Sequence, residues 1–205
     1  MTKRISAKKK ISRKLGASLW GQAKDPYLKR NYRPGQHGTS PKGRSSDYGL
    51  QLRAKQRMKF IYGNISEKQF RNTFDLAAKS KGDVSENFIG LLESRLDTIV
   101  YRANFVPTVF AARQFVSHKH VSVNGKVVNI SSYRLKIGDV VQVREKFRQM
   151  AIVIDSMNKM ERDVPSYLQL DKDNFSVKLI TAPTFAEVPY AVEMQPHLIT
   201  EFYSR

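Results

Sequence analysis

The residues that could do chemistry in this 205-residue chain are basic, and they are concentrated near its N-terminal end. Residues 1–60 contain 17 Lys or Arg and only two acidic residues, whereas residues 61–205 contain 19 basic and 16 acidic residues. A dense group of cations neutralises phosphates and releases their counterions. The net charge of +18 therefore points to a nucleic acid as the partner.

Catalytic chemistry has few candidates in this sequence. The absence of cysteine excludes disulfides, cysteine-ligated zinc, iron–sulfur clusters and thiol nucleophiles. Among four histidines, only His118 and His120 are closely spaced, and because Lys119 lies between them we expect phosphate rather than zinc at this pair. There is also no phosphate-binding glycine fingerprint, nucleophile elbow or acidic two-metal cluster. We predict no catalytic residue, metal or cofactor, and hence no enzyme.

Two other uses of a basic N-terminal segment stay open, namely a mitochondrial transit peptide and an arm on an anionic membrane. The segment Arg30–Gly38 argues against both uses, because it contains Gly, Pro and Tyr and has no long apolar helical face. The aromatic residues among these cations suit stacking on RNA bases, or else they anchor the segment to the folded body: Trp20, Tyr27, Tyr32 and Tyr48. No stretch approaches the roughly 18 apolar residues of a membrane span, so we expect a cytoplasmic chain.

Hydrophobic periodicity and capping residues predict the elements that must position the cations. Helices are predicted over residues 47–62, 66–82, 83–102 and 108–117. Ser66, Asp83 and Thr108 are their expected capping residues. Residues 33–46 contain several Gly and Pro and should form an extended connection with turns.

The pattern changes to short strands after residue 120. Asn124-Gly125 accepts positive φ at both positions and predicts a tight type I′ hairpin between residues 121–123 and 126–128. A third strand should follow Gly138-Asp139, and one or two more should lie around residues 176–180. Residues 94–146 carry nine basic and three acidic residues, so this compact helix-and-strand module is a predicted binding surface.

Five runs of residues resemble the bacterial small-subunit ribosomal protein S-four family. These runs are RPGQHG (33–38), SDYGLQLRAKQR (46–57), LLESRLDTIVYRANF (91–105), ARQFVSHKHVSVNGKVVNISSY (112–133) and HLITEFYSR (197–205). The third and fourth runs also resemble the RNA-binding module named after that protein, which occurs in several RNA-modifying enzymes. The flanking runs resemble the ribosomal protein and not an attached enzyme.

The resemblance implies an α+β fold with a discontinuous, mostly helical domain. Residues 1–45 would form a basic extended N-terminal arm, and residues 46–93 a helical domain completed by residues 181–205. An inserted RNA-binding α+β domain, residues 94–180, would contain the small helix-plus-β-hairpin module at about residues 94–157. Many relatives bind zinc through an N-terminal cysteine cluster, which this chain lacks.

The resemblance also implies a function. Members are structural constituents of the small ribosomal subunit: monomers within the ribosome that bind its rRNA and nucleate assembly of the subunit body. They influence translational accuracy beside ribosomal protein S-five and line the mRNA entrance, and some repress their own operon. Two rival functions are an RNA-modifying enzyme, for which too few residues remain after the module, and a DNA-compacting protein.

RNA in A-form is recognised chiefly by shape and charge, so we expect contacts from basic and polar side chains. In the arm these are Lys3, Arg4, Lys8, Lys9, Lys10, Arg13, Lys14, Arg30, Arg33, Gln36 and His37; in the helical domain, Arg53, Lys55, Arg57 and Lys59; and in the module, Arg95, Arg102, Arg113, Ser117, His118, Lys119, His120, Asn124 and Lys126. Lys42 and Arg44 are candidates for the mRNA entrance. The alternative is a solvated surface charge or, for Arg95 and Arg102, an internal ion pair with Asp97 or Glu93.

Overall fold

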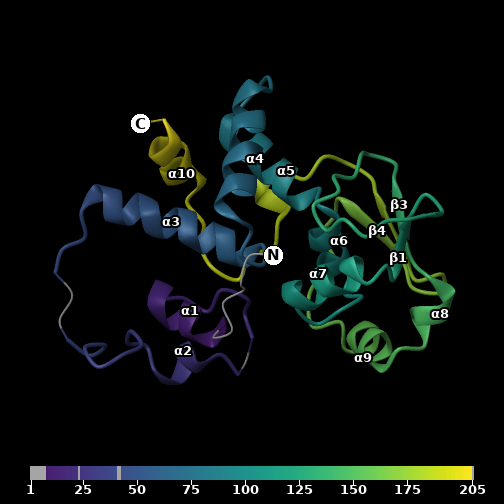
Figure 1. Ribbon diagram of the computed structural model, residues 1–205, viewed down its shortest axis with the longest axis horizontal. Coiled ribbons are helices and arrows are strands. Elements are labelled where there is room, and N and C mark those ends of the chain that lie inside the picture. Colours follow the sequence, from purple (N-terminus) through teal and green to yellow (C-terminus); the bar gives the residue numbers. More distant parts are fainter. Residues whose placement is uncertain (1–7, 23, 41–42, 205) are drawn as a thin grey trace. The chain divides into compact units, whose positions relative to one another are not determined.

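The computed structural model describes residues 8–22, 24–40 and 43–204, which fold into helices and one antiparallel sheet (Figure 1). Contacts divide the chain into two units, one of residues 1–71 with 190–205 and one of residues 72–189. The division at 71/72 falls inside a helix, so the domain boundaries expected from the resemblance stay predictions. None of the helices in the described ranges is long and apolar enough to cross a membrane.

The first unit is helical. Its elements are α1 (Lys8–Leu15), α2 (Pro26–Lys29), α3 (Asp47–Ile61), the start of α4 (Glu67–Lys79) and α10 (Pro196–Tyr203). The predicted start of α3 is confirmed, because Ser46 Oγ accepts a hydrogen bond from Gly49 N at 3.2 Å. α10 packs on α3, where Gln51 Nε2 donates to Glu201 Oε2 at 3.0 Å.

The N-terminal segment differs from the extended arm that the sequence predicts. Ile11 and Leu15 lie four residues apart in α1, and both side chains are buried. At the start of α2, the Asp25 carboxylate accepts hydrogen bonds from Tyr27 N at 3.0 Å and Ser18 Oγ at 3.3 Å. Helices as short as α1 and α2 are stabilised by tertiary packing rather than by helix propensity. Their few apolar residues form too weak a pattern to predict either helix from the sequence.

The second unit begins within α4 and contains most of the remaining helices. They are α5 (Val84–Glu93), α6 (Leu96–Arg102), α7 (Val109–Ser117), α8 (Glu145–Arg148), α9 (Ala151–Lys159) and a 3-10 helix, η1 (Phe185–Glu187). The predicted caps of α5 and α7 are confirmed. Asp83 Oδ1 accepts from Glu86 N at 3.1 Å, and Thr108 Oγ1 accepts from Ala111 N at 3.1 Å.

The single helix predicted over residues 83–102 is wrong, because the structure has two helices there. Ser94 ends α5, with its N–H and Oγ both donating to Gly90 O, and Arg95 is extended. The break frees backbone groups for pairing with a later segment: Arg95 pairs with Arg134, and Leu96 N donates to Tyr133 O at 2.8 Å. A tertiary hydrogen bond thus interrupts an apolar pattern that continues through the break.

The sheet lies entirely in the second unit and is antiparallel throughout. Its strands are β1 (Val121–Val123), β2 (Lys126–Val127), β3 (Val140–Val143), β4 (Leu168–Asp171) and β5 (Ser176–Leu179), in the order β2-β1-β3-β5-β4. Val123 pairs with Lys126, so only Asn124 and Gly125 connect β1 to β2. Their φ values of 48° and 78° are those that a type I′ turn requires.

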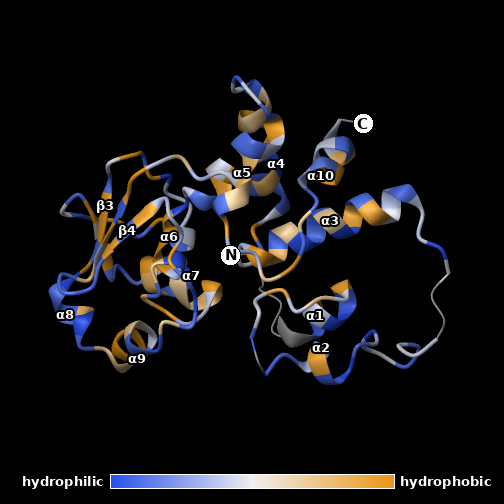
Figure 2. Ribbon diagram, turned by 180° about the vertical axis from the view of Figure 1, so that it is seen from behind, coloured by the Kyte–Doolittle hydropathy of each residue, from blue (hydrophilic) through white to orange (hydrophobic). Residues whose placement is uncertain are grey.

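One face of the sheet forms part of the core. On β3 and β5 the alternate residues that point into it are Val141, Val143, Val177 and Leu179, all buried. Val140 and Lys178, which pair with each other, are exposed on the opposite face. α6 and α7 lie beside the sheet in both ribbon views, and Figure 2 shows hydrophobic strands but a hydrophilic α8.

Candidate nucleic-acid interface

The structure places most, but not all, of the predicted RNA-contact residues. Lys3, Arg4 and Lys42 lie outside the described residues, as do the side chains of Lys8 and Lys9. In the first unit the exposed predicted residues are Lys10, Lys14, Arg30, Arg33, Gln36, His37 and Arg44. These side chains are available to a polyanion.

The loop that carries Gln36 and His37 is fixed by its backbone. Gly38 N donates to Gly35 O at 3.1 Å, and a Cβ on Gly38 would lie 1.9 Å from Arg33 O. No residue with a side chain fits at that distance. The glycine therefore closes a tight turn that leaves both side chains exposed.

Arg13 is half-buried and bonds to the loop that follows α2. Its Nε donates to Tyr32 O at 3.1 Å and its Nη2 donates to Arg33 O at 3.2 Å. The guanidinium carbon also lies 4.7 Å from the centroid of the Tyr32 ring. Arg13 thus attaches the loop to α1 and acts as a positioning residue, and its contact with RNA stays a prediction.

The four cations predicted on α3 all have partners within the first unit. Arg53 donates to Ser45 Oγ, and Arg57 Nη1 donates to Glu193 O at 3.2 Å. Lys55 and Lys59 both donate to the Glu67 carboxylate, each at 2.9 Å. These cations, predicted as RNA contacts with a solvated face as the alternative, thus form hydrogen bonds within the unit, and their contact with RNA stays a prediction.

Glu67 is the centre of that network. Its carboxylate accepts hydrogen bonds from Lys55, Lys59 and the Tyr203 hydroxyl, the last at 2.8 Å. Burial raises the pKa of Glu67, but the three hydrogen bonds outweigh it and lower the pKa to about 2. The Lys55 ammonium also lies 4.2 Å from the ring centroid of Phe202. The start of α4 is thereby tied to α3 and α10.

Arg95 and Arg102 form buried ion pairs, so the internal pairing considered for them is the arrangement found. Arg95 is 4% exposed and donates to both oxygens of Asp97, at 3.0 and 2.8 Å. Arg102 is 5% exposed and donates to both oxygens of Glu93, at 3.1 and 2.8 Å. Neither guanidinium is accessible to RNA, which corrects their prediction as contacts.

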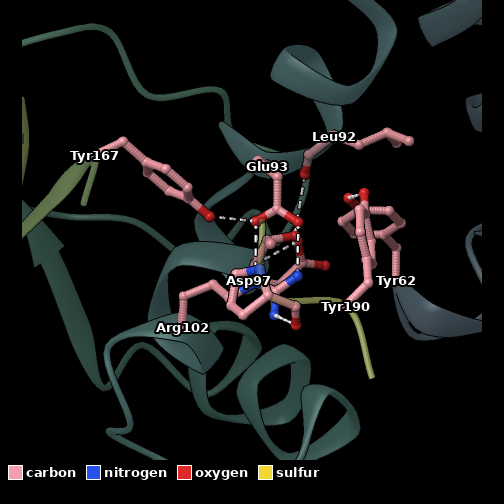
Figure 3. A network of polar contacts seen from close by, with 9 residues as sticks. Tyr62, Leu92, Glu93, Asp97, Arg102, Tyr167 and Tyr190 are labelled. Atoms are coloured by element: carbon pink, nitrogen blue, oxygen red, sulfur yellow. Dashed lines mark hydrogen bonds and ion pairs between the residues drawn. The ribbon is translucent and has the colours of Figure 1, made fainter. Parts of the chain in front are cut away.

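The Glu93 pair is part of a larger buried network (Figure 3). Tyr167 OH donates to Glu93 Oε2 at 2.8 Å, the oxygen that also accepts from Arg102 Nε. Arg102 Nη1 also donates to Pro189 O at 3.2 Å. Glu93 thus links α5 to α6 and to Tyr167, the residue before β4. Through Arg102 the same network reaches Pro189, at the end of the unit.

The turn after α7 holds the exposed part of the predicted module surface. Ser117, His118 and Lys119 are exposed, and Lys119 has a positive φ of 62°. Arg144, which sequence reasoning missed, fixes this turn: its Nη1 donates to Lys119 O at 2.9 Å and its N–H to His120 O at 3.0 Å. The only sequence signal for Arg144 was its place directly after a predicted strand.

His120 is half-buried, and its contact with phosphate stays a prediction. Its ring lies between those of Phe115 and Phe147, at centroid distances of 4.8 and 4.0 Å. Its Nδ1 is buried without a hydrogen-bond partner among the described residues. Burial, then the charges of His118 and Arg144, lower the pKa of His120. The His120 ring thus packs against Phe115 and Phe147 and supports the turn after α7.

The hairpin presents one cation on a fixed support. Asn124 was predicted to contact RNA, and in the structure its side chain joins the turn after β1 to β3. Its Nδ2 donates to Asp139 Oδ1 at 2.8 Å, and its Oδ1 accepts from Val140 N at 2.9 Å. Lys126 is exposed on the edge strand β2.

Arg113, another predicted contact residue, is half-buried on α7, and its carbonyl oxygen accepts a hydrogen bond from Ser117 Oγ at 2.7 Å.

Within the described residues, no three His, Asp or Glu side chains gather as metal ligands. This arrangement provides positive charge at fixed positions. Exposed cations lie on a turn and a hairpin whose backbones are held by hydrogen bonds from Arg144 and Asn124. Such a surface can bind phosphates.

Comparisons with known proteins agree over the whole chain. Residues 3–93 match the family model "Ribosomal protein S4/S9 N-terminal domain", and residues 94–141 match the model "S4 domain". The small ribosomal subunit protein uS4 of Brucella abortus (strain S19) is 59% identical over 205 residues, 100% of each chain. That of Brucella anthropi is 58% identical, again over 100% of each chain.

Replacement of Glu67 tests the first network. Because the folded-state pKa of Glu67 lies below its ordinary value of 4.5, its contribution to stability is present above that pH and is lost as the pH falls toward about 2. We expect urea midpoints of Glu67→Gln to fall less between pH 6 and pH 3 than those of the unaltered chain. An equal fall in both proteins would contradict the network.

Replacement of Arg102 tests the second network. Arg102→Ala leaves the Glu93 carboxylate buried without its cation, so we expect a loss of about 3–5 kcal/mol in the free energy of unfolding. Lys119→Ala, which removes an exposed cation, should change that free energy by less than about 0.5 kcal/mol. Chemical denaturation measures both values, and similar losses would place Arg102 at the surface instead.

Proposed function

The chain belongs to the family of small ribosomal subunit protein uS4, and on that premise we propose how its surface binds ribosomal RNA. It is a constituent of the small ribosomal subunit with an RNA-binding S4 domain, and not an enzyme. One observation carries the proposal: some cations have protein partners, whereas others are exposed on α1, on loops and on the β1–β2 hairpin.

The exposed set forms the proposed contact surface of each unit. In the first unit it consists of Lys10, Lys14, Arg30 and Arg33, beside Gln36 and His37. In the second unit it consists of His118, Lys119 and Lys126. The proposal leaves out Arg95, Arg102, Lys55 and Lys59, because each already forms an ion pair within the protein, the two lysines with the same carboxylate of Glu67.

Rigidity is what makes these cations effective. Binding costs conformational entropy for each side chain or loop that has to be ordered, so a preformed turn loses less on association. The turn at Lys119 is held by Arg144, and the hairpin beside Lys126 is held by Asn124. A folded RNA junction, itself recognised by shape, is the ligand that suits such fixed charges.

The finer roles follow from the family resemblance and are part of this proposal. They are early, primary binding to small-subunit rRNA that nucleates assembly of the subunit body, a contribution to translational accuracy beside ribosomal protein S-five, and a basic lining of the mRNA entrance. For the entrance the support is Arg44, which is exposed. The proposed location is the ribosome of a bacterial cytoplasm, as a monomer within the particle and with no membrane partner.

The proposed architecture for this function keeps a basic N-terminal arm and an inserted RNA-binding module. In support, the second family model begins at residue 94, and the β1–β2 hairpin with α7 lies within it. For the arm the support is the charge of residues 1–60, now seen to include two short helices.

Salt dependence tests whether phosphate contact dominates binding. If about eight phosphates are contacted, the logarithm of the association constant for a small-subunit rRNA junction should fall with log salt at a slope of about −6 to −7. Filter binding between low and moderate salt measures the slope. A slope near −1, or equal affinity for duplex DNA, would contradict recognition of folded RNA through phosphates.

Paired substitutions test the assignment to the second unit. Lys119→Gln with Lys126→Gln removes two phosphate contacts, so we expect weaker junction binding and a salt slope shallower by about 2. The matched control is Lys159→Gln with Lys172→Gln, two exposed lysines outside the proposed set. Equal loss in both double variants would mean that net charge, and not position, determines binding.

A further inference from the structure

Tyr32 is an exposed aromatic residue with a cation on its ring. It lies in the first unit between α2 and α3, and 40% of its surface is exposed. The guanidinium carbon of Arg13 lies 4.7 Å from the ring centroid. One part of the ring is therefore covered by a planar cation, while another part is open to solvent.

The ring is held rigidly for a residue outside regular structure. Arg13 donates to the carbonyl oxygens of both Tyr32 and Arg33, so one side chain fixes the backbone that directly follows the Cα of Tyr32. Arg13 itself is anchored, because α1 buries Ile11 and Leu15. A platform that is already ordered loses little conformational entropy when a ligand stacks on it.

The exposed surface of this ring has no partner among the described residues. Three other tyrosines of the first unit do have one: the Tyr48 ring lies 5.7 Å from Phe202, and Tyr62 and Tyr190 share a 2.6 Å hydrogen bond. For Tyr32, Arg13 is the one side chain of the described residues that engages the ring. The exposed surface is thus available for a ligand.

The surroundings indicate what that ligand is. Arg30 and Arg33, two residues before and one residue after the ring, are both exposed. An aromatic ring flanked by cations is the arrangement that single-stranded nucleic acid requires, because each base stacks on the ring and its phosphates meet the cations. A paired base inside a duplex is already stacked and cannot lie on the ring.

We propose that Tyr32, backed by Arg13 and flanked by Arg30 and Arg33, is a stacking site for one unpaired RNA base. The inference rests on the proposed function, since it takes RNA as the partner. It extends that function by adding a contact that distinguishes single-stranded from duplex RNA. The exposed cations contact only phosphates, which both forms of RNA have.

The test uses the full chain with two RNA probes, a single-stranded adenine octamer and a duplex of the same length, at one salt concentration. We expect Tyr32→Leu to bind the octamer about 5- to 100-fold more weakly than the unaltered chain and the duplex equally well. Tyr32→Phe, which keeps the ring, should bind both probes normally. Tyr48→Leu is the matched control, an exposed tyrosine whose ring already has a protein neighbour.

The salt slope gives an independent result. Because no charge is removed, Tyr32→Leu should lower affinity for the octamer without changing its slope. Unchanged octamer affinity, an equal loss on the duplex, or a loss with Tyr32→Phe would each overturn the stacking site. Failure of the proposed function has a different signature, since the unaltered chain would then not bind the rRNA junction in a salt-dependent manner.

Discussion

A carboxylate with no exposure, Glu93, is the constraint on which the second unit depends. An unpaired charge in the interior costs several kcal/mol, so its neighbours must be placed to compensate it. Arg102 supplies the opposite charge and two hydrogen bonds, and Tyr167 supplies a third. These donors come from separate places in the sequence, so the geometry of α5 and α6 and the approach to β4 are specified together.

The same logic explains how a chain with a net charge of +18 folds without excessive self-repulsion. Some cations serve as internal connectors. Arg13 fixes a loop, Lys55 and Lys59 share Glu67, and Arg144 fixes a turn. The exposed cations are presented by the segments that these connectors hold. In this protein, therefore, positive charge both stabilises the fold and forms the proposed binding surface, and the two tasks are assigned to different residues.

Much of the fold could be predicted because its signals are local. Asp83 and Thr108 cap helices through backbone groups two or three residues away, and Asn124-Gly125 specifies its hairpin alone. The roles of individual cations could not be predicted in this way. Lys55 is buried because Tyr203 and Phe202 return to it from the other end of the chain, and the helix break at Arg95 depends on pairing with Arg134. Family resemblance identified the function, but only the contacts separate structural from exposed cations.

The return of α10 to α3 has a consequence for how the polypeptide is made. Residues 190–205 are translated after the whole of the 72–189 unit, yet they complete the unit that starts the chain. On a translating ribosome the later-starting unit can therefore finish folding first, while α3 waits for its C-terminal partner with part of its apolar surface uncovered. Until α10 is available, this surface of α3 leaves the nascent chain open to aggregation or to chaperone capture.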